Sequence, residues 1–374
     1  MTDQPTSPRP LTDEQARFGR RLGLSRRQTL AASMGLATAG AVGAAVTTAS
    51  PASAVPNRAL VPPPRRGIIL YTVRDVIGRD PGTTDAPSGF REVLKYLSEV
   101  GYRQVEFAGY TQHANAVGGA DLGTTQGARQ LKRWLDAFGI VAQGNHGSVP
   151  STITAATLAE FDRTCEIATI LGMKHVGTGG DPTGGSTKAE WDAAADRWNI
   201  LGERAMRNHG LKLYTHNHDG AYGFLLDSPD AAGAMIRSTG VRKLEYFLSV
   251  TDPKFVWLEM DIYWAHVAQF KHTDFTAPDG AEARNIFDPA LLVARHARRY
   301  PLFHAKDGNN VPTADSGYDM VPLGQGDIDY QSFFRRIDSR NYANPMFEMD
   351  NGTYGNGSLD NARISIEAMA ALKG

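Results

Sequence analysis

The chain has 374 residues, of which 41% are hydrophobic and 21% charged, and this globular composition excludes a wholly disordered protein. Residues 1–54 hold six Arg and three acidic residues, which leaves 33 basic and 37 acidic residues and a net charge of about −4 in the remainder. Nucleic acid is therefore disfavoured as a partner, because phosphate backbones are bound through clustered Lys and Arg. The single cysteine, Cys165, lies in an apolar run, so we predict a core residue without a function and exclude disulfides and thiolate metal clusters.

The beginning of the chain has the features of an export signal. Residues 25–30 read SRRQTL, and an uncharged, Ala-rich stretch leads from Ala31 to Ala52-Ser53-Ala54. This pattern resembles a twin-arginine signal with an A-x-A cleavage site. We therefore expect residues 1–54 to be a signal peptide and the protein to be exported to the periplasm or the outside of the cell. A membrane anchor is the alternative, but Ala, Gly and Thr insert poorly, so no stable membrane insertion is expected after cleavage.

The next segment is rich in proline. Residues 55–66 contain Pro62-Pro63-Pro64 and are predicted to be a stiff linker outside the fold. Residues 67–374 are predicted to form a single domain.

This domain alternates short β-rich runs with amphipathic helical runs. In residues 89–99, for example, Phe90, Val93, Leu94 and Leu97 fall on one helical face. Eight such pairs in about 310 residues favour an α/β fold of the (β/α)8 TIM-barrel type. A doubly wound open sheet is the alternative, but no glycine-rich phosphate loop follows the first strand. The expected strands are 67–72, 103–107, 140–146, 174–178, 211–216, 255–261, 301–305 and 345–349.

Ionisable residues stand at the carboxyl ends of six of these strands. In a barrel those ends meet at one mouth, where the active site is built. The six are Glu106, His146, His216, Asp261, His304 and Glu348. His216 and His218 lie two residues apart, hence on one side of an extended chain. Carboxylates combined with imidazoles are ligands suited to Mn²⁺, Mg²⁺, Co²⁺ or Zn²⁺, so we expect a divalent metal ion as the cofactor.

Several of these runs resemble a known family. They are YTVRD at 71–75, GYRQVEFAGY at 101–110, LYTHNHD at 213–219, DPKFVWLEMDIYWA at 252–265, PLFHAKD at 301–307 and MFEMDN at 346–351. They resemble the xylose isomerase-like TIM-barrel superfamily, in particular its sugar phosphate isomerase/epimerase branch. The resemblance covers nearly all of the chain after residue 67. It implies a metal-dependent enzyme that moves a proton next to the carbonyl of a carbohydrate.

The resemblance also implies roles for individual residues. The metal is held by side chains of the last four strands of this barrel, which here are His216, Asp261, His304 and Glu348. Many relatives have Glu at the position of His216, so whether His216 or His218 binds the metal stays open.

The same resemblance suggests which residues act on the substrate. Glu348 is expected to be the catalytic base, with His216, Glu106 and Lys306 as further catalytic groups. His146, Tyr71, Trp264 and His218 are expected to contact the sugar. Each has a structural alternative: Glu348 as a carboxylate paired with Lys306 or Arg74, Lys306 as a surface lysine, and the aromatic residues as core.

Four functions fit this pattern, and the first is preferred. It is a sugar isomerase or epimerase acting on an unphosphorylated sugar or keto-sugar, because an exported protein meets few sugar phosphates. The second is a lyase or hydrolase that releases the aglycone of a 3-keto-glycoside on the same barrel. The third is a sugar-binding barrel without catalysis. An endonuclease is the fourth, but it needs further metal ligands and a basic groove. An oligomer is possible in each case.

Overall fold

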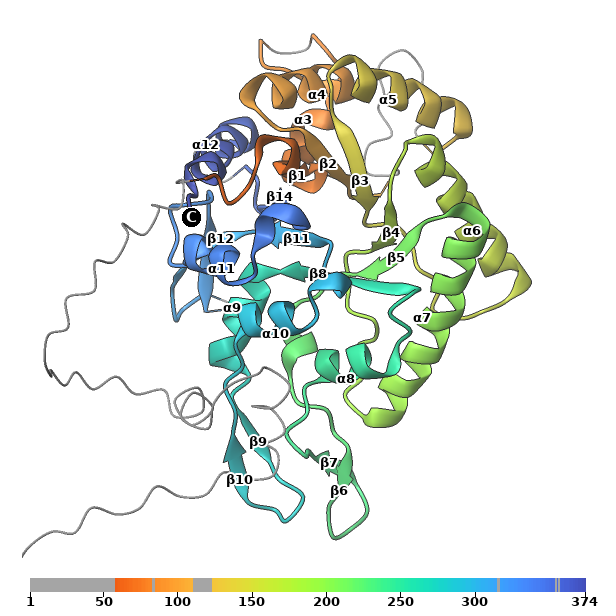
Figure 1. Ribbon diagram of the computed structural model, residues 1–374, viewed down its shortest axis with the longest axis vertical. Coiled ribbons are helices and arrows are strands. Elements are labelled where there is room, and N and C mark those ends of the chain that lie inside the picture. The colour runs from red at the N-terminus through yellow and green to blue at the C-terminus, as the bar shows by residue number, and fades with distance from the viewer. Residues whose placement is uncertain (1–57, 83–84, 110–122, 315–316, 354, 356) are drawn as a thin grey trace, which may run out of the picture. The chain divides into compact units, whose positions relative to one another are not determined.

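The computed structural model describes residues 58–82, 85–109, 123–314, 317–353, 355 and 357–374 (Figure 1). The expected signal peptide and residues 55–57 lie outside this range. Residues Val55–Gly374 form one compact unit. In the part of the chain that is described, no helix is both long enough and apolar enough to cross a membrane.

Eight parallel strands form the centre of this unit, as the alternation predicts. They lie in the order β3, β2, β1, β14, β11, β8, β5, β4. The barrel is closed between β3 and β4 by a parallel bridge between His146 and Gly177 and by a 2.8 Å hydrogen bond from the Gly147 amide to the Gly177 carbonyl. The strands are β1 (Gly67–Ile69), β2 (Gln104–Phe107), β3 (Val141–Asn145), β4 (His175–Thr178), β5 (Lys212–Thr215), β8 (Val256–Asp261), β11 (Leu302–Ala305) and β14 (Asn344–Phe347).

Helices surround the strands (Figure 1). In α4 (Gly89–Val100) the four apolar residues expected on one face are all buried, and the helix ends at Gly101, whose φ of 118° a residue with a side chain rarely adopts. The other main helices are α5 (Thr125–Ala137), α6 (Ala155–Ile170), α7 (Lys188–His209), α8 (Lys243–Val250), α9 (Ile262–Lys271), α10 (Pro289–Arg295), α11 (Tyr330–Arg336) and α12 (Ser358–Ala371). Cys165 of α6 is buried, which confirms the predicted core position, and burial raises the pKa of its thiol to about 12.

The first strand is shorter than predicted. It ends at Ile69, and residues 70–73 form a 3-10 helix (Leu70–Val73) followed by the short α3 (Arg74–Ile77). The Arg74 guanidinium holds this turn, since it donates hydrogen bonds to the carbonyls of Tyr71 at 2.7 Å and Asp350 at 2.8 Å. Tyr71 therefore lies on a helical turn beside the barrel mouth.

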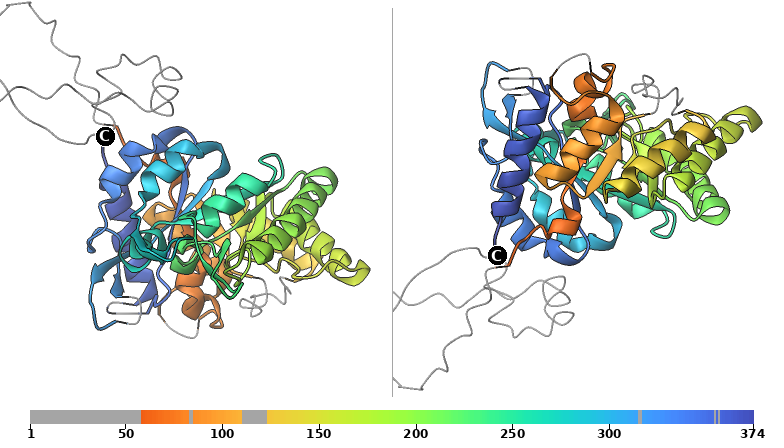
Figure 2. Two further views of the ribbon diagram at one scale, coloured as in Figure 1. Left: turned by 90° about the horizontal axis from the view of Figure 1, so that it is seen from below. Right: turned by 90° about the horizontal axis from the view of Figure 1, so that it is seen from above.

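The prediction that residues 55–66 form a linker outside the fold is wrong for residues 58–66. Leu60 and Val61 are buried, and the backbone of residues 58–60 pairs with that of residues 372–374. Arg65 donates a hydrogen bond to Asn344, the first residue of β14. The segment thus packs beside the C-terminus at the amino ends of the strands (Figure 2). Proline content suggested a stiff spacer, but the two apolar residues directly before the proline run, Leu60 and Val61, lose contact with water when the segment docks.

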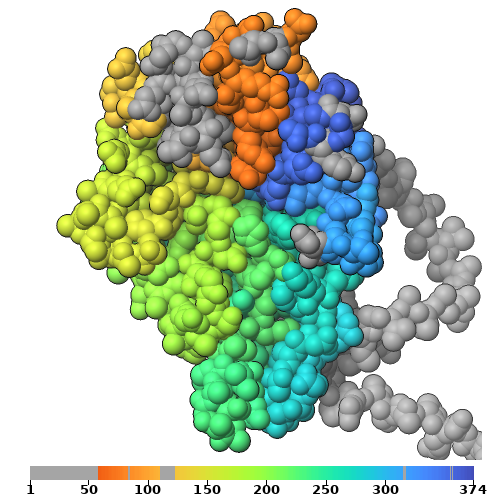
Figure 3. Space-filling view, turned by 180° about the vertical axis from the view of Figure 1, so that it is seen from behind, coloured from red at the N-terminus to blue at the C-terminus, as the bar shows by residue number. Residues whose placement is uncertain are grey.

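Long connections follow several strands. The hairpin of β6 (Ser228–Pro229) and β7 (Met235–Arg237) follows β5, and the hairpin of β9 (Asp274–Thr276) and β10 (Glu282–Arg284) follows α9. These two hairpins lie side by side at one end of the unit (Figure 3), joined by a 2.9 Å hydrogen bond from the Ser238 amide to the Thr276 carbonyl. A third hairpin, β12 (Asp307–Asn310) with β13 (Tyr318–Val321), follows β11.

Candidate active site

The carboxyl ends of the strands bring four potential metal ligands together. One nitrogen or carboxylate oxygen from each of His216, Asp261, His304 and Glu348 lies within 4.8 Å of the others, and all four residues are buried. Asp261 ends β8 and also caps α9, because its Oδ1 atom accepts a hydrogen bond from the Trp264 amide. The resemblance implied this set, and the fold places it around one point.

The donor atoms of this set fit one divalent ion. Bonds of about 2.0–2.2 Å place two ligand atoms at most about 4.4 Å apart, close to the spacing found here. Burial lowers the pKa of His216 to about 3, so its imidazole is neutral and able to bind a metal. Its Nδ1 atom is buried without a hydrogen-bond partner, while Nε2 lies 3.3 Å from Asp261 Oδ2. His218 is not among the four, so the geometry favours His216 as the ligand.

A second buried group lies next to the first and shares His304 with it. It comprises Glu106, His146, Glu259 and His304. The Nε2 atom of His304 lies 2.8 Å from Glu106 Oε2, and His146 Nε2 lies 2.8 Å from Glu259 Oε2. The Tyr214 hydroxyl donates a further hydrogen bond to Glu106. These contacts pair both carboxylates with imidazoles below the barrel mouth.

The pKa values of the two carboxylates in this group are shifted in opposite directions. Burial alone would raise the pKa of Glu106, but His146 and His304 outweigh it and lower the pKa to about 2. Burial and the charge of Glu106 raise the pKa of Glu259 to about 7. At neutral pH the carboxylate of Glu106, which lies against His304, is therefore ionised.

Lys306 lies between the ligand carboxylates. Its Nζ atom is 2.9 Å from Asp261 Oδ2, 2.8 Å from Glu348 Oε2 and 3.1 Å from Asp350 Oδ1. Burial alone would lower the pKa of Lys306, but these carboxylates raise it well above its usual value. The ammonium is therefore charged, although the side chain is buried, and the expectation of a surface lysine does not apply.

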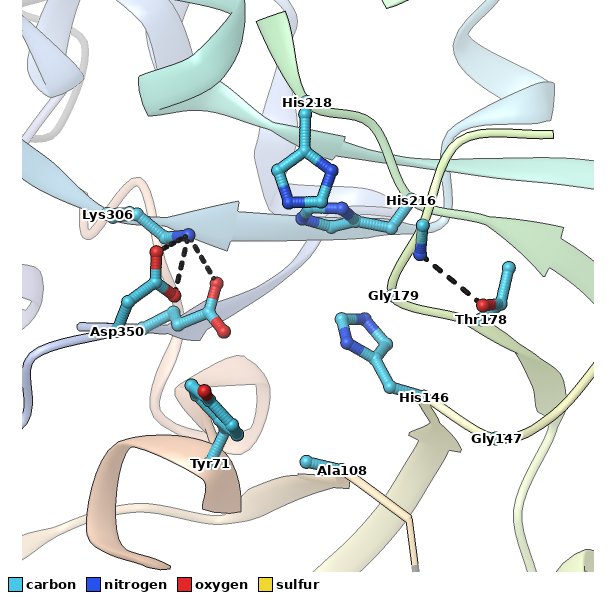
Figure 4. A pocket seen from close by; sticks show the side chains of 12 residues that line it. Tyr71, Ala108, His146, Gly147, Thr178, Gly179, His216, His218, Lys306 and Asp350 are labelled. Carbon is cyan, nitrogen blue, oxygen red and sulfur yellow. Dashed lines mark hydrogen bonds and ion pairs between the residues drawn. The ribbon is translucent and has the colours of Figure 1, made fainter. Parts of the chain in front are cut away.

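A polar cavity of about 530 Å³ opens above these groups (Figure 4). His216, Lys306 and Glu348 reach its wall, together with His146, His218, Tyr71 and Asp350. Thr178, which ends β4, and the following Gly179 and Gly180 also line the cavity, beside His146. A side chain at Gly179 would come within 2.5 Å of His146 Nδ1, so glycine is needed for this approach.

Two residues expected at the substrate lie elsewhere. Glu106 is fully buried below His304 and is not among the residues that line the cavity, so it does not face a substrate there. Trp264 belongs to α9, because Asp261 turns the chain into that helix, and its ring lies behind His218 with centroids 5.6 Å apart. Neither expectation of direct substrate contact fits this geometry.

Three features of the site were not predicted. Glu259 precedes Asp261 by two residues on β8, so both side chains point into the barrel, and this alternation was a signal that could have identified it. Asp350 follows Glu348 by two residues, but it lies beyond the end of β14, where alternation no longer applies. The glycine-rich wall after β4 carries no ionisable group at the strand end.

Comparisons with known proteins agree with this architecture. A family model described as xylose isomerase-like TIM barrel matches residues 94–373. No curated protein shows a significant match to the sequence.

Solved structures share the fold at low sequence identity. A sugar phosphate isomerase/epimerase from Parabacteroides distasonis is 20% identical, with a TM-score of 0.58 over 82% of this chain and 94% of that one. A probable 3-DHS dehydratase from Bacillus anthracis is 13% identical, with a TM-score of 0.52 over 82% and 98%. A 3-keto-D-glucoside 4-epimerase from E. coli is 12% identical, with a TM-score of 0.51 over 82% and 98%. At these identities the comparisons show the fold alone.

Proposed function

Because the chain belongs to the xylose isomerase-like TIM-barrel family, we propose that it is a metal-dependent sugar isomerase or epimerase. Its substrate is an unphosphorylated sugar or keto-sugar. The observation that carries the proposal is the group of His216, Asp261, His304 and Glu348 at the wall of a polar cavity. Two imidazoles and two carboxylates are donors suited to Mn²⁺, Mg²⁺, Co²⁺ or Zn²⁺.

The chemistry requires a proton to leave a carbon next to a carbonyl. A bound divalent ion supplies Lewis-acid polarisation of that carbonyl. Glu348 supplies the base: it lines the cavity, and although burial alone would raise its pKa, His304 and Lys306 hold that pKa well below the usual value, so the carboxylate is ionised. Lys306 also lines the cavity, and its ammonium stabilises negative charge that develops on the substrate.

The cavity favours a substrate without phosphate. Among the described residues that line it, Lys306 is the only Lys or Arg, and its ammonium is already bound by carboxylates. The rest of the wall includes three glycines, two hydroxyl side chains and three imidazoles. These groups can form hydrogen bonds with the uncharged hydroxyls of a sugar. His146, His218 and Tyr71 are the proposed sugar contacts.

A second candidate function is supported by the space beside the cavity. A further cavity of about 430 Å³ adjoins it and shares Ala108, His146 and Gly147 with it. Together they offer more room than one sugar ring needs. A 3-keto-glycoside would place its aglycone there, and proton removal would then expel the aglycone by elimination.

A substrate panel tests these functions. The metal-loaded chain is incubated with keto-sugars and 3-keto-glycosides, and the products are analysed by mass spectrometry with chromatographic separation of isomers. A new isomer of unchanged mass supports the isomerase or epimerase, and a free aglycone supports the lyase. Tight sugar binding without any product across the panel would support a sugar-binding barrel instead.

We also propose that the protein is exported through the twin-arginine pathway. The support is the run of Arg26 and Arg27 before an uncharged stretch and Ala52-Ser53-Ala54. Replacing both arginines with Lys is expected to retain an uncut protein in the cytoplasm, as detected by fractionation. Normal export of that variant would contradict the proposal.

A further inference from the structure

Lys306 occupies an unusual place for a lysine next to proposed metal ligands. Its Nζ atom contacts Asp261 Oδ2 at 2.9 Å and Glu348 Oε2 at 2.8 Å, and both residues belong to the four-residue ligand group. The side chain is only 2% exposed. The ammonium thus neutralises the same two carboxylates that a divalent ion would bind.

The two cations exclude each other from this place. A carboxylate oxygen can accept a hydrogen bond from an ammonium or bind a metal ion. It does not do both at once in a buried site, because two positive charges a few ångström apart repel strongly there. If the ammonium left without replacement, Asp261 and Glu348 would remain as buried, unpaired charges. The geometry therefore links the departure of the ammonium to the arrival of a metal ion.

Asp350 is a third carboxylate in contact with the ammonium, and it could keep the ammonium paired if Asp261 and Glu348 bound a metal ion. Its oxygens lie 3.1 and 3.2 Å from Lys306 Nζ, and its side chain is 38% exposed at the cavity wall. Asp350 is outside the ligand group, so a metal ion would not compete for it. The Trp264 ring, whose centroid lies 5.4 Å from Nζ, is a further favourable surface for the cation (Figure 4 shows Lys306 and Asp350). The flexible lysine stem permits this short movement.

We propose that Lys306 is a resident cation of the site, which pairs with Asp261 and Glu348 without metal and with Asp350 when a divalent ion binds. The inference rests on the proposed metal-dependent function. Metal loading then has a second effect, because it moves the ammonium from the ligands toward the cavity. The Lys306 ammonium can then stabilise negative charge that develops on the substrate only when a divalent ion is bound.

Binding of Mn²⁺ to the metal-stripped full chain tests this, measured by titration calorimetry. Lys306→Met keeps the apolar stem and removes the competing cation, so we expect it to bind Mn²⁺ roughly tenfold more tightly than the unchanged chain. Asp350→Asn removes the third carboxylate and is expected to bind Mn²⁺ roughly tenfold more weakly. Lys188→Met breaks an exposed ion pair with Asp192, neither residue of which lines the cavity, and is the matched control, with unchanged affinity.

Thermal unfolding supplies a second measurement. With chelator present, Lys306→Met is expected to unfold at a lower temperature than the unchanged chain, because its carboxylates lack a cation. Saturating Mn²⁺ should remove most of that difference. This comparison also shows whether the variant is folded during the titration.

The outcomes separate the two proposals. If folded Lys306→Met binds Mn²⁺ no more tightly than the unchanged chain, the resident-cation proposal is overturned while the metal-dependent function stands. If only Lys306→Met binds the ion, competition by the lysine stands and the metal-dependent function fails. Absence of Mn²⁺ binding to both proteins contradicts both.

Discussion

The imidazole of His304 joins two carboxylates through its two nitrogens: Nε2 lies 2.8 Å from Oε2 of Glu106, and Nδ1 lies 2.7 Å from Oε2 of Glu348. Nδ1 therefore faces the proposed metal ligands, and Nε2 faces the buried group below them. A hydrogen bond from Nε2 to an ionised carboxylate fixes the ring and makes the opposite nitrogen a better ligand. We therefore propose that Glu106 positions His304 and does not contact the substrate.

Glu106→Gln is predicted to bind metal roughly 10–100-fold more weakly, because the amide supports His304 less well than a carboxylate does. The measurement is Mn²⁺ titration of the metal-stripped chain. Glu99→Gln, which alters an exposed pair with Lys95, is the control and should have no effect. Unchanged affinity combined with lost turnover would instead favour the expectation that Glu106 acts on the sugar.

The two histidines after β5 are predicted to differ in their effect on metal binding. His216→Ala should lose bound metal, because His216 belongs to the buried ligand group. His218→Ala should keep it and bind sugar more weakly, because the His218 side chain lies on the cavity wall and is 48% exposed. Metal analysis of both purified proteins decides this, and loss of metal in His218→Ala alone would reverse the assignment.

Leu60→Ala is predicted to destabilise the fold by about 2–5 kcal/mol, because a buried leucine leaves a cavity when it is truncated. Leu60 is 1% exposed and lies in the segment that sequence composition suggested to be a linker. The free energy of unfolding in denaturant is the measurement. Leu291→Ala, at a side chain 43% exposed, is the control with little effect. Equal stability of both variants would restore the linker interpretation.

Because of His175, the free energy of unfolding is predicted to decrease as the pH is lowered. Burial lowers the pKa of this imidazole to about 4, and its Nε2 atom has no hydrogen-bond partner. Between pH 6.5, the usual value, and pH 4 the unfolded chain therefore binds a proton that the folded chain does not. Stability from this group is complete above pH 6.5 and declines by on the order of 2–3 kcal/mol toward pH 4.

His175→Gln isolates this contribution. Its unfolding free energy should decline less steeply than that of the unchanged chain between pH 7 and pH 4.5, because other titrating groups act equally in both proteins. A difference between the two proteins that stays constant over this range would show that His175 does not titrate in this way.

Much of the architecture could be predicted from the sequence. The alternation of β-rich and amphipathic runs placed all eight strands in the correct order. The end of the first strand was misplaced, because a side chain from a segment close to it contacts a distant part of the chain. Arg74, for example, holds a helical turn directly after Ile69 by bonding the Asp350 carbonyl. Docking of Leu60 likewise depends on partners near the C-terminus, which local composition does not reveal.

The residues of the site could be predicted only in part, because the local sequence does not show how deeply a side chain lies in the barrel. Their place at the carboxyl ends of predicted strands put His304 and Asp261 at the barrel mouth, and strand alternation from Asp261 could also have placed Glu259 inside the barrel. It does not give depth, so Glu106 appeared to reach the substrate although it lies below His304. The contact between Lys306 and Asp350 joins two connections after different strands and has no local signal.

Removal by Glu348 of a proton from the carbon next to a carbonyl can be followed by deuterium exchange. The metal-loaded chain is incubated in deuterated water with keto-sugars and 3-keto-glycosides, and the substrate and product are examined by mass spectrometry and NMR. We predict deuterium next to the carbonyl with the unchanged chain and none with Glu348→Gln, although that variant still binds sugar. Equal deuterium incorporation by folded Glu348→Gln would contradict the role of Glu348 as the base. No exchange and no aglycone release with any substrate by the unchanged chain would contradict the proposed enzyme.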